Sequence, residues 1–193
     1  MRASWGWGVI WMALMATPTF AEAPLGTAPT YTDRKIGVLP SDPLPNEAAI
    51  LKRIWVPGLD EGFVPQGLSV VGRAVYVAAY KSVENAGRGP CRLYRLDPAS
   101  SKVTGALDLP PRCGHAGGVA PGTPGHVWVV DTRDIFEVEI TQPASATIGK
   151  VVRHIRLTGQ IKGSYAASTT DALWLGAYET HGEPRLYKFP FSA

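Results

Sequence analysis

Short apolar runs, each closed by a Pro, Gly or polar turn, recur along the chain after its first twenty residues. Residues 115–132 fit a strand, a Pro/Gly turn and a second strand that is almost continuously apolar. The same pattern precedes this stretch at residues 66–80 and follows it at residues 164–178. No long stretch shows the 3.6-residue period of an amphipathic helix. The pattern predicts an all-β protein built from a repeated unit.

The predicted strands fall into successive cycles of four. They cover residues 62–70, 74–80, 91–96 and 103–109, then 115–120, 126–131, 135–140 and 151–157, then 164–168, 173–178 and 185–189. Tyr76, Trp128 and Trp174 hold matching positions about 46 to 52 residues apart. This period is typical of a β-propeller blade, so we expect a β-propeller-like fold with about three four-stranded blades. An immunoglobulin-like sandwich is the alternative, but sandwiches do not require an internal repeat.

The third cycle lacks a fourth strand, whereas residues 50–56 form an extra predicted strand ahead of the first cycle. This N-terminal strand is expected to complete the third blade. Three blades are too few to close a ring comfortably, and two explanations stay open. Two chains assemble three plus three as a homodimer, or the chain is a truncated, inactive remnant of a longer propeller that exposes sheet surfaces.

Residues 1–21 are predicted to be a secretory signal peptide, with Arg2 at its start and an apolar core from Trp5 to Met15. A membrane anchor is the alternative. Residues 22–49 are rich in Pro and are predicted to be an extended leader, followed by the β domain over residues 50–193. No later segment is apolar enough to span a membrane. The processed protein is therefore expected to be periplasmic or secreted, with no membrane partner.

Charge and cysteine content narrow the function classes further. Charged residues make up 18% of the chain and the formal net charge is +3, without a basic stripe, which argues against a nucleic-acid partner. In propeller topology Cys91 begins a third strand and Cys113 enters the next blade, so both lie at the same end of the blades. Export then favours a disulfide between them over two free thiols.

The same topology gathers polar side chains at one mouth of the blades. The loops that enter the inner strands and those that leave the second strands meet there, a common place for ligand sites. The predicted ligand-binding residues are Gln66, Tyr80, His115, Asp131, Ser164, Tyr178 and Glu179.

Two of these residues are candidates for catalysis. His115 can act as a general base or donate a hydrogen bond to a ligand, and the alternative is a turn histidine bonded to a neighbouring loop. Asp131 can orient His115 or bind a metal, and the alternative is a cap on the turn formed by residues 131–134. Calcium prefers several carboxylates, and this mouth offers mainly Asp131 and Glu179, so no cofactor is expected unless calcium binds there.

Three stretches carry a resemblance to a known group of proteins: residues 62–67 (GFVPQG), 91–98 (CRLYRLDP) and 115–119 (HAGGV). Across residues 50–190 the chain resembles secreted β-propellers of the broad strictosidine-synthase, gluconolactonase and NHL-repeat type. This resemblance implies a propeller fold and, for enzymes of the group, esterase or lactonase activity with a central calcium held by acidic and amide ligands. The chain lacks most of that acidic set.

We therefore expect an exported binding module that holds a small molecule, glycan or peptide at the propeller mouth. An esterase-type or lactonase-type hydrolase is the alternative, with His115 as base and Asp131 as orienting group or metal ligand.

Overall fold

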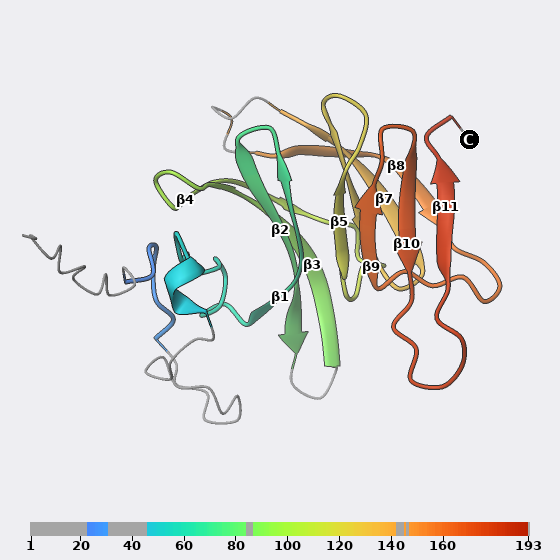
Figure 1. Cartoon of the computed structure of the whole chain (residues 1–193), viewed down its shortest axis with the longest axis horizontal. Helices are drawn as coiled ribbons and strands as arrows, with labels where there is room; N and C mark the ends of the chain where they lie inside the picture. The colour runs from blue at the N-terminus through green and yellow to red at the C-terminus, as the bar shows by residue number, and fades with distance from the viewer. Residues whose placement is uncertain (1–22, 31–45, 84–86, 142–144, 146, 193) are drawn as a thin grey trace, which may run out of the picture.

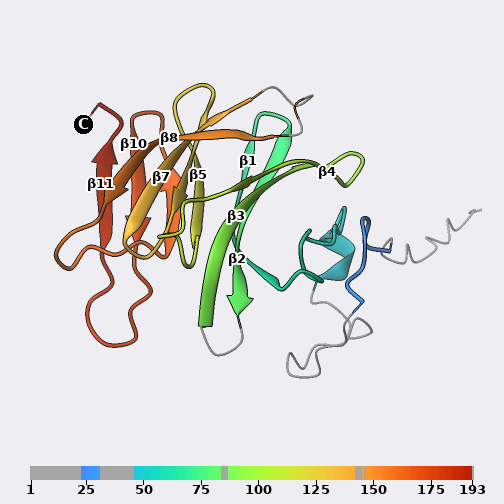
Figure 2. The same cartoon turned by 180° about the vertical axis from the view of Figure 1, so that it is seen from behind.

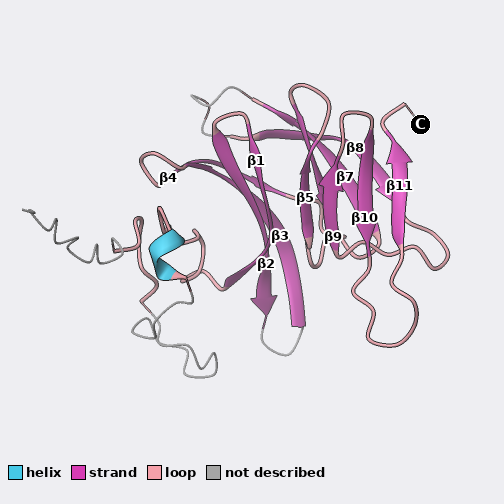
Figure 3. Ribbon diagram, in the orientation of Figure 1, coloured by secondary structure: helices cyan, strands magenta, loops and turns pink. Residues whose placement is uncertain are grey.

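Three antiparallel sheets stand side by side in the computed structural model, which describes residues 23–30, 46–83, 87–141, 145 and 147–192 (Figure 1). The strand orders are β1-β2-β3-β4, β5-β6-β7-β8 and β9-β10-β11. Strands dominate the described residues, and a short 3-10 turn, η1, is the helical element among them (Figure 3). The elements are η1 (Glu47–Ala49), β1 (Phe63–Val71), β2 (Ala74–Val83), β3 (Gly87–Asp97), β4 (Lys102–Asp108), β5 (Gly118–Pro121), β6 (His126–Val130), β7 (Asp134–Ile140), β8 (Gly149–Arg156), β9 (Tyr165–Ser168), β10 (Ala172–Gly176) and β11 (Leu186–Pro190).

The all-β prediction is confirmed, and the three predicted cycles correspond to the three sheets. The sheets form an open row and do not close into a ring (Figure 1). Within the described residues the third sheet has three strands and ends at β11. No helix among these residues has the length and apolar character needed to cross a bilayer. Residues 1–21, the predicted signal peptide, lie outside the described residues.

The strand predicted over residues 50–56 is wrong. Ile54 makes one isolated parallel bridge with Leu25, and no ladder continues from it. Ile54 and Val56 instead pack their side chains against the first sheet. This segment lies at the end of the molecule opposite β11, so it does not complete the third sheet within the chain (Figure 2). The nearby leader residue Thr30 donates its N–H to Asp60, which holds the described part of the leader on the domain.

Two other predicted boundaries shift. β2 and β3 extend into residues 81–90, between the two predicted strands over 74–80 and 91–96, because Ser82 still pairs with Arg88. β5 begins at Gly118 and not at His115, because residues 114–116 form a tight turn before the strand.

Glycines allow the first strands of the three sheets to touch. β1 contacts β5, and β5 contacts β9. A Cβ added to Gly67 would lie 3.0 Å from the Gly117 carbonyl oxygen, and one added to Gly118 would lie 2.6 Å from the Ala166 nitrogen. The contact at Gly118 is closer than a real Cβ approaches backbone, and the one at Gly67 is tighter than most, so the small residues of these strands are a packing requirement.

Apolar side chains fill the two spaces between the sheets. One cluster joins the first and second sheets, and another joins the second and third sheets. The central strand β6 contributes to both clusters, and its residues 127–130 are all buried. The second sheet is therefore the most deeply packed part of the molecule.

A fully buried arginine also ties the first sheet to the second. Arg95 in β3 donates from Nη1 to the Thr141 carbonyl at 3.1 Å and from Nη2 to the Ser145 carbonyl. Its Nε donates to the Thr104 hydroxyl at 3.0 Å. The planar guanidinium of an arginine carries several N–H donors in fixed directions, so it reaches acceptors on both sheets at once. The compact ammonium of a lysine is less suited to this role.

Candidate functional site

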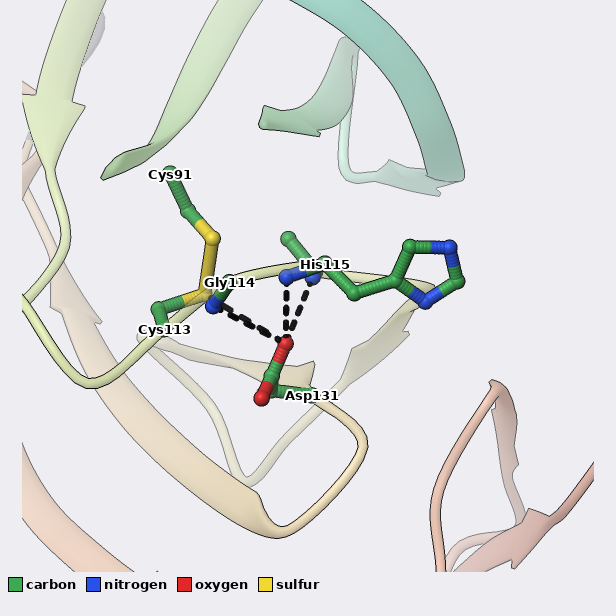
Figure 4. The surroundings of a disulfide bond; sticks show 6 residues. Cys91, Cys113, Gly114, His115 and Asp131 are labelled. Atoms are coloured by element: carbon green, nitrogen blue, oxygen red, sulfur yellow. Dashed lines mark hydrogen bonds between the residues drawn. A yellow bond between two sulfur atoms is a disulfide. The ribbon is translucent and has the colours of Figure 1, made fainter. Parts of the chain in front are cut away.

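The turn that leads into β5 is held by one buried carboxylate. Asp131 Oδ1 accepts the backbone N–H groups of Gly114, His115 and Ala116, at 3.2, 2.6 and 3.0 Å (Figure 4). Ala116 has a positive φ of 51°, a conformation that costs energy for a residue with a side chain. The three charge-assisted bonds offset this cost and fix the path of the turn.

The end of β6 positions Asp131 for this role. Val130 pairs with Gly118 across the β5–β6 ladder, so the next residue after Val130 lies opposite the turn before β5. The Asp131 backbone N–H donates to the Asp134 carbonyl at 2.7 Å and closes the turn between β6 and β7. The carboxylate thus caps a different turn from the one that sequence analysis considered for it.

A disulfide holds the same turn from the other side. Cys91 in β3 and Cys113 are joined, with their Cα atoms 5.7 Å apart, as the sequence predicts. Both residues are buried, and Cys91 pairs with Tyr80 across β2 and β3. The bond links residues 22 positions apart. In the chain-entropy model such a loop closure stabilises the folded state by about 3 kcal/mol.

Metal binding fits this cluster poorly. Cys91, Cys113 and Asp131 are close enough to be considered as a ligand group, and they are the one such group among the described residues. The two sulfurs are bonded to each other and are not thiolates. Calcium requires several oxygen ligands, whereas Asp131 Oδ1 already accepts three N–H groups.

His115 is the side chain that this turn presents. Its imidazole is half-buried and packs against Tyr80, with ring centroids 5.7 Å apart and planes inclined by 46°. Figure 4 shows the ring directed away from the Asp131 carboxylate, which meets the His115 backbone instead. Asp131 therefore does not hold the His115 imidazole in place, as a carboxylate that supports a catalytic histidine would.

The inner strands bring two more of the predicted residues near this turn. Gln66 is exposed at an irregularity in β1, next to Gly67, which packs on Gly117 and Gly118. Ser164 precedes β9, and its carbonyl lies directly against Gly117. The tip of each inner strand therefore meets its neighbour at this end of the sheets.

Ser164 also fixes the exit of β10. Its hydroxyl accepts the backbone N–H of Tyr178 at 3.0 Å, while the Tyr178 side chain is 75% exposed. The structure thus groups Tyr80, His115 and Asp131 directly and Ser164 with Tyr178, and Gly117 connects the two groups.

Glu179 belongs to a separate hollow. Its carboxylate lies 3.5 Å from Lys162 Nζ, and both line a surface hollow of about 410 Å³ between loops of the second and third sheets. Arg133 lines the same hollow and donates to the carbonyls of Gly159 and Ile161. None of the turn residues 113–117 lines it.

Sequence analysis misses one further polar cluster. His154 is an exposed residue of β8, and its Nε2 lies 2.6 Å from the Oδ1 of buried Asp134, while its ring stacks on Phe136. Arg156 contacts the same carboxylate. The alternation of β8 correctly places His154 on one face, but the acidic partner lies twenty residues earlier and gives no local signal.

Comparison with known proteins adds no family. No protein-family model matches the sequence, and no curated protein matches it either.

Proposed function

We propose that the chain is an exported binding protein with propeller-like sheets, which holds a small neutral ligand such as a glycan at the strand ends around His115. The repeated four-stranded unit and the adjoining inner strands support the propeller-like part. The apolar N-terminal sequence and the buried Cys91–Cys113 disulfide support an oxidising compartment, either the periplasm or the exterior. The resemblance to secreted propellers of the strictosidine-synthase and gluconolactonase type agrees with both.

The rigid support of one turn is the observation that carries the binding proposal. Asp131, the disulfide and the glycine contacts all fix residues 113–118. Within that stretch His115 is the side chain long and polar enough to reach a ligand. Holding a partly exposed imidazole in one place lowers the ordering cost of binding, which is how binding sites gain affinity without added contacts.

The groups around His115 favour an uncharged ligand with a ring. Tyr80 packs beside the imidazole, and Tyr178 and Gln66 are exposed at the same end of the sheets. Aromatic faces pack on the apolar faces of sugar rings, while amide and imidazole groups bond to hydroxyls. The hydrolase alternative has less support, because Asp131 bonds to the backbone of the turn.

The test is binding of a panel of soluble oligosaccharides made of neutral hexoses and N-acetylhexosamines, measured by calorimetry on the purified chain. We expect saturable binding of at least one of them. His115→Ala and Tyr80→Ala should each weaken it by about tenfold or more. His126→Ala is the matched control and should leave affinity unchanged, because His126 lies at the start of β6, at the opposite end of that strand from Asp131.

Failure to bind any oligosaccharide in the panel would contradict the glycan proposal. Full affinity in His115→Ala would show that the ligand binds elsewhere on the molecule. Thermal melting of each variant separates loss of binding from loss of the fold.

A further inference from the structure

The same aromatic position recurs in the second strand of every sheet, but its surroundings change. Tyr76 in β2 is 3% exposed and Trp128 in β6 is 2% exposed, and each lies in a cluster shared with the following sheet. Trp174 holds this position in β10 and is only half-buried. The third sheet therefore presents a face of the type that the first two sheets cover with a neighbour.

The register of the third sheet identifies the rest of this face. Trp174 pairs with Lys188 in β11, and Gly176 pairs with both Leu186 and Tyr165. Side chains of directly paired residues share one side of an antiparallel sheet. Leu186 is 62% exposed, Tyr165 is exposed, and the Lys188 ammonium lies 5.7 Å from the Trp174 ring centroid. We name residues 165, 174, 186 and 188 the trailing face.

The first sheet has a neighbouring sheet on one side only, the side opposite to that of the third sheet. Its outer side carries Val77 and Tyr94, which correspond to residues that the second and third sheets pack against a preceding sheet. The N-terminal segment covers part of this side through Ile54 and Val56. Leu68 and Val70 in β1 remain 68% and 61% exposed. Val77 is already covered, so we name residues 68, 70 and 75 the leading face.

We propose that two copies of the chain associate through these surfaces, the trailing face of each on the leading face of the other. The occupant is a second copy because the trailing face is the side of the third sheet that corresponds to the side of the second sheet packed on the third, and Leu68 and Val70 expose part of the matching side of the chain's own first sheet. Two equivalent seams related by a twofold axis bury both faces of both copies and close the pair.

The test is the solution mass of the purified chain by light scattering over a range of concentrations. We expect the mass of two chains. Leu186→Glu on the trailing face and Val70→Glu on the leading face should each reduce it to the mass of one chain. Both side chains are largely exposed, so neither substitution should unfold the monomer. Val152→Glu is the matched control, because Val152 is an exposed β-branched residue of β8 that lies on neither face.

A single-chain mass for the unmodified protein would overturn the proposal. An unchanged two-chain mass in Val70→Glu, with a loss in Leu186→Glu, would also overturn it, because the trailing faces would then pair with each other. Masses that rise steadily with concentration would indicate an open chain of copies and exclude the closed pair. A mixture of Leu186→Glu and Val70→Glu chains should recover two-chain mass, because that pair retains one intact seam.

Discussion

At the scale of single residues, the position of His115 depends on the buried carboxylate of Asp131, which bonds to the backbone of the turn. Asp131 is buried and satisfies three consecutive backbone donors with one oxygen. A buried N–H group that loses its acceptor is left without a hydrogen bond to protein or water, which destabilises the fold. The Asp131 carboxylate prevents this for three N–H groups at once.

Asp131→Ala should lower the free energy of unfolding by about 3 kcal/mol, because it leaves three N–H groups without their acceptor. Urea denaturation at neutral pH measures the change. Asp108→Ala serves as the control and should cost less than about 1 kcal/mol, since Asp108 takes part in an exposed ion pair with Arg92. Equal effects of the two substitutions would contradict the structural role assigned to Asp131.

The turn after β3 gives a pH-dependent contribution. The Ser100 hydroxyl, and then the Ala99 N–H, donate to Asp97 and lower the pKa of its carboxyl below the ordinary 3.8. Because the folded pKa is the lower one, the stabilisation is complete above the unfolded pKa and disappears as pH falls through the folded value.

Asp97→Ala should therefore reduce the urea midpoint at neutral pH, and the difference from the unmodified chain should shrink as the pH falls below 3.8 and through the folded pKa. Ser100→Ala removes the main donor and should show the same pH dependence in weaker form. A difference that persists undiminished in acid would rule out the carboxylate as its source.

At the scale of elements, the contact between inner strands sets the spacing of the sheets. Gly118 faces the backbone of β9 so closely that an added Cβ would lie 2.8 Å from the Ala166 Cβ and 2.9 Å from the Tyr165 carbonyl carbon. Backbone on both sides cannot yield as a flexible side chain can.

Gly118→Ala should destabilise the fold by about 2 kcal/mol or more through overpacking, measured as a shift of the thermal or urea transition. Gly114→Ala is the matched control four residues earlier, because nothing lies within 4 Å of its added Cβ. Similar losses in both variants would point to a general intolerance of the turn and not to the strand contact.

The sequence predicts the strands well because their apolar and turn residues alternate with a clear period. It fails at residues 50–56, where Ile54 and Val56 are apolar because they pack on a sheet face, a need that an extended segment meets without a ladder. It also extends β5 back to His115, because the carboxylate that turns residues 114–116 follows the neighbouring strand β6, sixteen residues after His115. Contacts between distant parts of the chain leave little trace in a local pattern.

The candidate site divides in the same way. The repeat correctly predicts the pairing of Cys91 with Cys113, since both fall at the same end of their strands. It does not predict that Asp131 binds backbone while the imidazole of His115 is directed elsewhere, because side-chain direction depends on the strained Ala116. Glu179 lies with Lys162 in a separate hollow, which the pattern of loops does not distinguish.

At the scale of the whole molecule, one polar residue joins two sheets that otherwise meet through apolar side chains. Arg95 is fully buried and donates to acceptors on both sheets. A buried cation that loses its hydrogen-bond acceptors destabilises the fold. The link between the first two sheets therefore depends on the shape of the Arg95 guanidinium.

Arg95→Lys should lower the free energy of unfolding by about 3 kcal/mol although it keeps the charge, because one ammonium cannot reach both the Thr104 and Thr141 acceptors. Equilibrium denaturation followed by circular dichroism measures this. Arg153→Lys is the control, since Arg153 lies partly exposed over the Trp128 ring. A loss no greater than that of the control would show that the joint is held by apolar packing alone.

The position of the disulfide has a consequence for biogenesis. Both cysteines lie in the first 113 residues, and the bond joins the third strand of the first sheet to the turn that opens the second. A chain that emerges from its N-terminus can therefore oxidise before its last eighty or so residues are available. The junction between the first two sheets can lock early and offer the later strands a finished surface on which to assemble.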